Sequence, residues 1–178
     1  MVTAVLIVIL VVAVAVLTVF VAGYNKLRAA DVRVDEALGG IDVELTRRAS
    51  LIPSLVLTVQ TFASHERAVL ERITQARAAL DASVAGRSVA QRGVAEQQLD
   101  TALGQVLALG QSYPQLSSSS NFLELQRNLA DTENKLSFAR QYYNDAVATL
   151  NKLSSTIPLM YLADRAGVSE REYYRTPR

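Results

Sequence analysis

The first 22 residues carry almost no polar side chains. From Val2 to Ala22 the only polar residues are Thr3 and Thr18, and no charged residue occurs before Lys26. An α-helix of about 21 residues is roughly 30 Å long, which matches the hydrocarbon core of a bilayer. The pattern therefore predicts a single transmembrane helix that contacts the lipid bilayer through residues 2–22.

A cleaved signal peptide and a buried core helix share part of this pattern. A signal peptide carries basic residues ahead of a shorter apolar stretch, whereas the sequence opens on Met-Val-Thr. The small residues at 21–23 keep a cleavage site open as an alternative. An uncharged core helix of this length is unusual in a chain of 178 residues. We therefore expect an uncleaved anchor.

After the anchor, apolar positions recur at intervals of three and four residues. Nothing alternates with a period of two, so no strands are expected. Each helix then carries one apolar stripe, which must be buried against other helices. The chain is thus predicted to be all-α, with an N-terminal single-pass transmembrane helix followed by an antiparallel bundle of long helices. The first series is Leu27, Val34, Leu38, Ile41, Leu45, Ile52, Leu55, Val59, Phe62, Val69, Ile73, Ala76 and Leu80, with Asp31 and Glu66 in its gaps; the second is Ala95, Leu99, Ala102, Val106, Leu109 and Tyr113; the third is Phe122, Leu125, Leu129, Leu136, Ala139, Tyr143, Ala146, Leu150, Leu153 and Ile157, interrupted by Thr132.

Prolines and small residues locate the predicted helix ends. Pro53 either lies in the first turn of a new helix that follows Ser50 or kinks one long helix. Residues 81–88 read as a turn. Pro158 ends the last long helix or bends it sharply.

The clearest loop is Tyr113-Pro114 followed by the serines at 117–120. Asn121 and Glu124, three residues apart, have the form of a capping box for the next helix. Gly39-Gly40 interrupts a helical pattern at a cost of about 1 kcal/mol per glycine relative to alanine. That pair is either a close packing point or a weak joint.

These boundaries give three parts. Residues 1–23 form the transmembrane anchor, residues 24–164 the helical bundle and residues 165–178 a C-terminal tail. Lys26, Arg28 and Arg33 follow the apolar span, and no basic residue precedes it in the sequence. The positive-inside rule then predicts a cell-membrane protein whose bundle is cytoplasmic and whose short N-terminus lies outside.

Composition excludes several classes of chemistry. Without cysteine there are no disulfides, thiolate zinc sites or cysteine nucleophiles, and one histidine rules out a histidine-rich metal site. A net charge of +1 argues against bulk nucleic-acid binding, which needs a basic excess. No glycine-rich phosphate loop or nucleophile elbow occurs. We predict no catalytic, cofactor-binding or metal-binding residues, no cofactor and no enzymatic activity.

Four polar residues nevertheless lie in or beside the apolar series: Glu66, Thr132, Glu133 and Arg140. Buried polar groups are costly unless paired, so a network from Glu to Arg, or to His65, is expected between helices. It would act as a polar layer that sets the register, with a binding patch as the functional alternative. Arg47-Arg48 is interpreted as a solvated face.

The string Ser-His-Glu-Arg at 64–67 is similar to the phosphoacceptor helix of sensor histidine kinases. The proline expected after it is missing, and Val69 and Leu70 replace the residues expected one turn later. His65 is therefore interpreted as a structural or surface residue near a helix bend. Phosphotransfer through His65 stays as the alternative function.

Spaced blocks across most of the chain resemble the bacterial LemA proteins. The resemblance implies a membrane-anchored bundle of long antiparallel helices and implies no enzymatic activity. The chain departs from the pattern at several aromatic positions, including Leu38, Leu150 and Ile157. The matching blocks are Tyr24-Asn25, residues 34–37 (Val-Asp-Glu-Ala), Ile41-Asp42-Val43, Leu45, Arg47-Arg48, residues 51–53 (Leu-Ile-Pro), Leu55-Val56, Thr58-Val59, His65-Glu66, Tyr113-Pro114, Leu116, Phe122, Leu125-Gln126, Leu129, Thr132-Glu133, Ala139-Arg140, Tyr143-Asn144, Val147, Asn151 and Pro158.

The sequence thus predicts a membrane-anchored, non-enzymatic helical bundle that serves as an interaction or scaffolding module at the membrane surface. Protein partners are expected, but the residues do not identify them. A second copy of the chain is one candidate, which would give a homo-oligomer. Nucleic acid is not expected as a partner.

Overall fold

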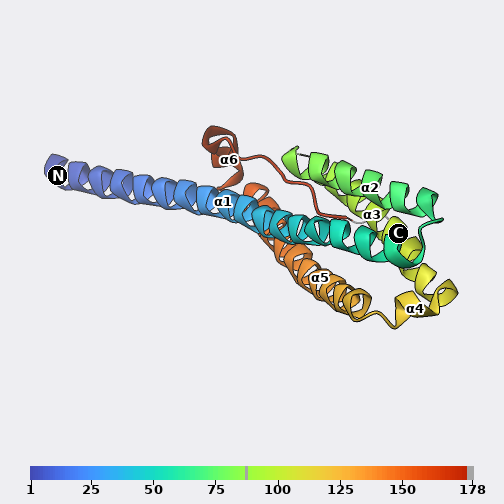
Figure 1. Cartoon of the computed structure of the whole chain (residues 1–178). Coiled ribbons are helices and arrows are strands. Elements are labelled where there is room, and N and C mark those ends of the chain that lie inside the picture. Colours follow the sequence, from blue (N-terminus) through green and yellow to red (C-terminus); the bar gives the residue numbers. More distant parts are fainter. Residues whose placement is uncertain (87, 176–178) are drawn as a thin grey trace. The chain divides into compact units, whose positions relative to one another are not determined.

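A computed structural model describes residues 1–86 and 88–175. This part of the chain consists of helices joined by short turns and contains no strand, which confirms the all-α prediction (Figure 1). The helices are α1 (Val2–Phe62), α2 (Arg67–Ala85), α3 (Val89–Ser112), α4 (Pro114–Ser117), α5 (Ser120–Ser154) and α6 (Met160–Ala166).

The helices belong to two compact units. Of the described residues, the first unit contains 1–37 and 144–172, and the second contains 38–86, 88–143 and 173–175. Helices α1 and α5 are each divided between the two units.

In the first unit, α1 opens with the apolar stretch. It is long and apolar enough to cross a membrane, and none of its most apolar part is buried in the structure. A core helix would be covered by its own chain, so this exposure excludes that alternative. Gly23 is the first buried residue of α1. A Cβ at Gly23 would lie 2.6 Å from Leu159 Cδ2 and 3.1 Å from Leu162 Cδ1, so glycine allows the segment at α6 to approach α1.

Polar contacts of Arg171 with α1 and α5 also hold the first unit together. Arg171 donates to Asp31 Oδ1 at 2.8 Å, and its Nη2 lies 3.1 Å from Asp35 Oδ1. The Asn151 amide donates to the Arg171 carbonyl at 3.0 Å and accepts from the Arg171 N–H at 2.9 Å. Asp31, which fills a gap in the apolar series, is thus buried with an arginine partner.

The second unit is an antiparallel bundle formed by the C-terminal part of α1, α2, α3 and the N-terminal part of α5. Helices α2 and α3 pack along their length, with Arg72 donating to Gln105 at 3.1 Å. Gly110 near the end of α3 faces Phe122 near the start of α5. Many core residues of the bundle belong to the predicted stripes, although Ala49, Leu103 and Leu116 are buried outside them. The stripe residues with less than 2% exposure are Ile41, Leu45, Ile52, Leu55, Val59, Ile73, Leu80, Leu99, Val106, Phe122 and Leu136.

Pro53 does not begin a helix. It lies inside α1, which runs without a break to Phe62, so the long-helix alternative is correct. The side chains of Ile52 and Leu55 on either side are buried, and their packing offsets the hydrogen bond that proline removes. The break falls instead at residues 63–66, where no proline marks it.

Other predicted ends need smaller corrections. The loop after Tyr113 contains the short helix α4, and Asn121 lies inside α5, so the predicted capping box is wrong. Helix α5 ends at Ser154, four residues before Pro158, whose peptide bond with Ile157 is cis. Ile157 is 69% exposed rather than part of the buried stripe.

The turn predicted at 81–88 begins too early, because α2 continues to Ala85 and α3 begins at Val89; residue 87 lies outside the described residues. The backbone N–H of Gly86 donates to the carbonyls of Ala82 and Ser83 at the end of α2. Gly39 and Gly40 have open space where a Cβ would stand, so they are not a close packing point.

Candidate functional site

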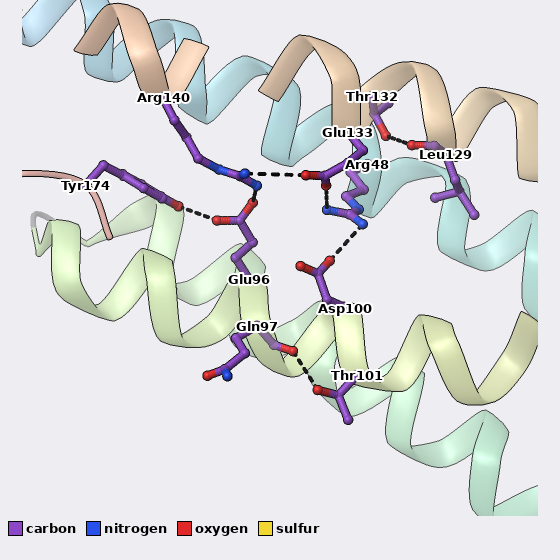
Figure 2. A network of polar contacts seen from close by, with 10 residues as sticks. All are labelled: Arg48, Glu96, Gln97, Asp100, Thr101, Leu129, Thr132, Glu133, Arg140 and Tyr174. Carbon is purple, nitrogen blue, oxygen red and sulfur yellow. Dashed lines mark hydrogen bonds and ion pairs between the residues drawn. The ribbon is translucent and has the colours of Figure 1, made fainter. Parts of the chain in front are cut away.

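A chain of charged side chains runs through the second unit (Figure 2). We call it the charge network; its members are Arg48 from α1, Glu96 and Asp100 from α3, Glu133 and Arg140 from α5, and Tyr174 near the C-terminus. The helices present these groups inward because each position falls beside the apolar stripe of its helix.

Arg48 joins three helices. Its Nη1 donates to Glu133 Oε2 at 2.7 Å, and its Nη2 lies 2.7 Å from Asp100 Oδ1. The residue is only 7% exposed, so the interpretation of Arg48 as part of a solvated face is wrong. Its neighbour Arg47 does lie on the surface, where it donates to the exposed Asp131 at 3.2 Å. One step along the helix turns the side chain by about 100°, which separates the two environments.

Glu96 is the most deeply buried member, with no exposed surface. Arg140 donates to its Oε1 through Nη2, and the Tyr174 hydroxyl donates to its Oε2 at 2.9 Å. Arg140 Nη1 also donates to Glu133 Oε1 at 3.3 Å. The ring of Tyr174 packs edge-on against Tyr143, with centroids 6.4 Å apart. Both oxygens of the buried carboxylate are therefore satisfied, as a charge removed from water requires.

Three carboxylates share two guanidinium groups in this network, and burial of the members shifts the pKa values of several of them. Burial raises the pKa of Asp100 to about 6, although Arg48 opposes the shift; Glu96 adds to it. Burial also raises the pKa of the Tyr174 hydroxyl far above its usual value, and the Glu96 carboxylate adds to that shift. Burial works against the charge of Arg140, but the neighbouring Glu96 carboxylate outweighs it and the pKa rises. Arg140 and Tyr174 thus keep their protons, and Asp100 is the member poised to titrate.

A second ion pair joins the buried Arg92 to the partly exposed Asp42. Arg92, 4% exposed, donates from Nε to Asp42 Oδ1 at 2.7 Å and from Nη2 to Asp42 Oδ2 at 3.0 Å. The same guanidinium donates to the carbonyls of Val84 and Ser88, on either side of the turn between α2 and α3. This forked arrangement fixes the turn against α1, because both carboxylate oxygens are held in one plane.

The polar layer expected from the sequence exists in part. Glu133 and Arg140 are members of the network. Glu66 instead accepts a hydrogen bond from the Tyr113 hydroxyl at 2.9 Å, and buried Thr132 donates to the Leu129 carbonyl of its own helix. His65 is exposed in the turn between α1 and α2, as expected, and is not a member.

Sequence reasoning missed Glu96, Asp100 and Arg92. They follow one another at intervals of four residues beside the apolar series of α3, and this spacing places all three on one helical face. That pattern was a usable signal. No comparable signal exists for Tyr174, which is 78 positions from its partner Glu96.

The arrangement binds helices to one another rather than presenting a reactive group. Each carboxylate of the network contacts a guanidinium, and no group of three or more metal-ligating side chains occurs among residues 1–86 and 88–175. A surface hollow of about 800 Å³ between α1 and α2 is lined by residues such as Gln60, Arg67 and Glu71, and none of its lining residues belongs to the network.

Known proteins are similar to parts of this sequence. The model of the LemA family matches residues 37–178. The chain is 30% identical over 73 residues to the magnetosome protein MamQ of Magnetospirillum gryphiswaldense, a match that covers 41% of this chain and 27% of that protein. Magnetosome proteins MamQ 1 and MamQ 2 of Paramagnetospirillum magneticum are 30% identical over 74 residues, again 27% of their length. The match thus spans about a quarter of these curated relatives, and none of the names denotes an enzyme.

Proposed function

This chain belongs to the LemA family, and on that premise we propose that it is a membrane-anchored, non-enzymatic bundle that serves as an interaction or scaffolding module at the membrane surface. One observation carries the proposal. Helix α1 runs without interruption from the apolar stretch at 2–22 into the core of the bundle at Leu45 and Leu55. The helix that carries the apolar stretch thus also contributes residues to the core of the bundle.

The charge network supports a structural rather than a chemical use of the bundle. Its charged groups are engaged with one another across α1, α3 and α5. A catalytic acid or base instead needs an approach for its substrate.

Helix α5 offers such a side chain. Phe138 is 73% exposed and lies on the outer side of the bundle. Aromatic residues are enriched at the centres of protein interfaces, so Phe138 is the position at which we expect a protein partner, another copy of the chain included.

Site-specific photocrosslinking in intact membranes tests this proposal. A benzophenone amino acid replaces Phe138 in the full chain, and the matched control places it at Arg127, an exposed position of the same helix. We expect a discrete protein adduct from position 138 and none from 127. Equal, diffuse labelling at both positions contradicts the interaction proposal, as does substrate turnover by the purified chain.

The bundle is further proposed to face the cytoplasm, because Lys26, Arg28 and Arg33 follow the apolar stretch. The chain has no cysteine, so a single Ser155→Cys substitution at an exposed site is a unique label. A membrane-impermeant maleimide should modify this cysteine only after the cells are permeabilised. Modification in intact cells would mean that the bundle lies outside the cell, and it would not contradict the anchor.

Phosphotransfer through His65 is the alternative class of function. His65 is exposed in the turn between α1 and α2, and this exposure is the feature that permits phosphotransfer. Incubation with acetyl phosphate, with His65→Ala as control, separates the two. An acid-labile label that is lost in the variant favours phosphotransfer; no label in either protein leaves the scaffold proposal.

A further inference from the structure

We propose that residues 157–161, at the start of α6, form a second membrane contact, in which the apolar side chains of Ile157, Met160 and Tyr161 enter the bilayer interface beside the anchor. The contact rests on the proposed membrane insertion of residues 2–22. Its occupant is lipid at the boundary between headgroups and acyl chains.

The depth of this segment follows from its contact with α1. Leu159 and Leu162 pack over Gly23, which comes directly after the last residue of the apolar stretch. With the stretch inserted, Gly23 lies at the edge of the hydrocarbon core, since about 21 helical residues fill that core. The residues that touch Gly23 therefore lie at the same edge, within reach of lipid.

The segment shows two apolar faces, and the chain covers only one of them. Leu162 and Ala163 are buried against the rest of the first unit. Ile157, Met160 and Tyr161 point away, with exposures of 69%, 41% and 67%. A helix end exposed to water normally carries polar side chains on its outer face. Three large apolar groups in five residues form the kind of patch that marks a contact surface.

The residues around the patch match an interface between lipid and water. Tyr24, one residue beyond Gly23, and Tyr161 both carry the amphipathic ring that is enriched at this depth. Exposed Lys152 and Arg165 lie on either side of the patch in the sequence, where long basic side chains can reach headgroups. The patch adjoins the apolar surface of residues 2–22, which is proposed to lie in lipid. Because the two surfaces are continuous, we expect lipid to cover the patch as well.

A single tryptophan can measure the contact, because the chain contains none. Tyr161→Trp is made in the full chain and reconstituted into phosphatidylcholine vesicles with and without lipids brominated near the headgroup end of the acyl chain. Ile157→Trp repeats the measurement at a second position. We expect both to be quenched by the brominated lipids by about twofold or more, as for side chains buried some 5–10 Å into the interface.

Two control variants separate this contact from the anchor itself. Phe20→Trp, within the apolar stretch, should be quenched wherever the anchor is inserted. Phe138→Trp, in the second unit, should not be quenched. Quenching at 20 without quenching at 157 and 161 overturns the lipid contact and leaves the anchor; no quenching at 20 overturns the anchor. Blue-shifted emission at 161 without quenching means that protein covers the patch, which also overturns the proposal.

Discussion

Helix α1 contains two stretches that differ both in the pattern of their apolar residues and in their surroundings. Residues 2–22 are apolar on every side, and all of them are exposed. Residues 38–62 carry a stripe of apolar side chains on one face. In this stripe Ile41, Leu45 and Ile52 are each at most 1% exposed. The difference follows the pattern of apolar residues: a single stripe is buried by packing on other helices, whereas a stretch that is apolar on every side and uncovered by its own chain is suited to lipid.

The largest test of this contrast puts charge into both stretches at matched exposure. Leu10→Arg with Val11→Arg should cost about 5–7 kcal/mol of insertion free energy, because each arginine at the centre of a span costs roughly 3 kcal/mol. Leu10 and Val11 are 64% and 61% exposed. Most of the variant should then be released from membranes by alkaline carbonate.

The matched control is Val43→Arg with Leu57→Arg, at positions 64% and 66% exposed on the same helix. This variant should stay in the membrane and unfold as the unmodified chain does, because its arginines meet water. If both double variants behaved alike, the two stretches would share one environment and the comparison would fail.

A cavity in the buried stripe should have the next largest effect. Leu45→Ala removes a side chain with no exposed surface and should lower the free energy of unfolding by about 2–5 kcal/mol. Leu57→Ala, at an exposed position, should change it by less than about 0.5 kcal/mol. Urea denaturation of the full chain in detergent micelles, followed by circular dichroism, measures both. Equal losses would mean that Leu57 is covered by a partner.

Within the second stretch, Arg48 is buried and Arg47 is exposed. The buried charge of Arg48 is tolerated because carboxylates surround its guanidinium group. Arg48→Met should cost about 2–3 kcal/mol, less than the roughly 3–5 kcal/mol of a fully buried pair because Asp100 and Glu133 are partly exposed. Arg47→Met, which removes a surface pair, should cost less than about 1 kcal/mol. The same denaturation experiment tests them, and a larger loss at Arg47 would contradict the role assigned to Arg48.

The smallest expected effect is a pH dependence at Asp100. Burial raises the pKa of this carboxyl to about 6 in the folded chain, above its value of 3.8 in the unfolded chain. The folded state therefore binds a proton that the unfolded state does not, and the free energy of unfolding should rise as the pH falls from about 7.5 to 5. In Asp100→Asn this rise should be absent. A rise of the same size in the variant would assign the titration to another group.

Prediction from the sequence succeeded where a pattern involves neighbours on one helix. The apolar stretch and the stripes through Leu45, Leu99 and Leu136 followed from spacing alone, since every third or fourth side chain lies on the same face. It failed where the outcome depended on a distant helix. Arg48 and Arg47 look alike in sequence, and only the position of Glu133, 85 residues away, separates them.

The helix ends show the same division. Pro53 is the strongest local helix breaker in the first stripe, yet α1 passes through it because the packing of Ile52 and Leu55 outweighs one lost hydrogen bond. The chain turns instead at residues 63–66, where the Tyr113 hydroxyl donates to Glu66. Local propensity costs about 1–3 kcal/mol at a single residue, which tertiary contacts readily exceed.

The amino-acid sequence alone specified that this chain is helical, that it begins with a stretch suited to lipid and that its helices must pack together, because hydrophobic periodicity is a local property. The folded arrangement specified which charges meet. Glu96 contacts Arg140 and Tyr174, and Arg48 contacts Asp100 and Glu133. These contacts form only when three helices and the residues near the C-terminus come together. A buried charge is stable only beside its partner, and here those partners lie far away along the chain.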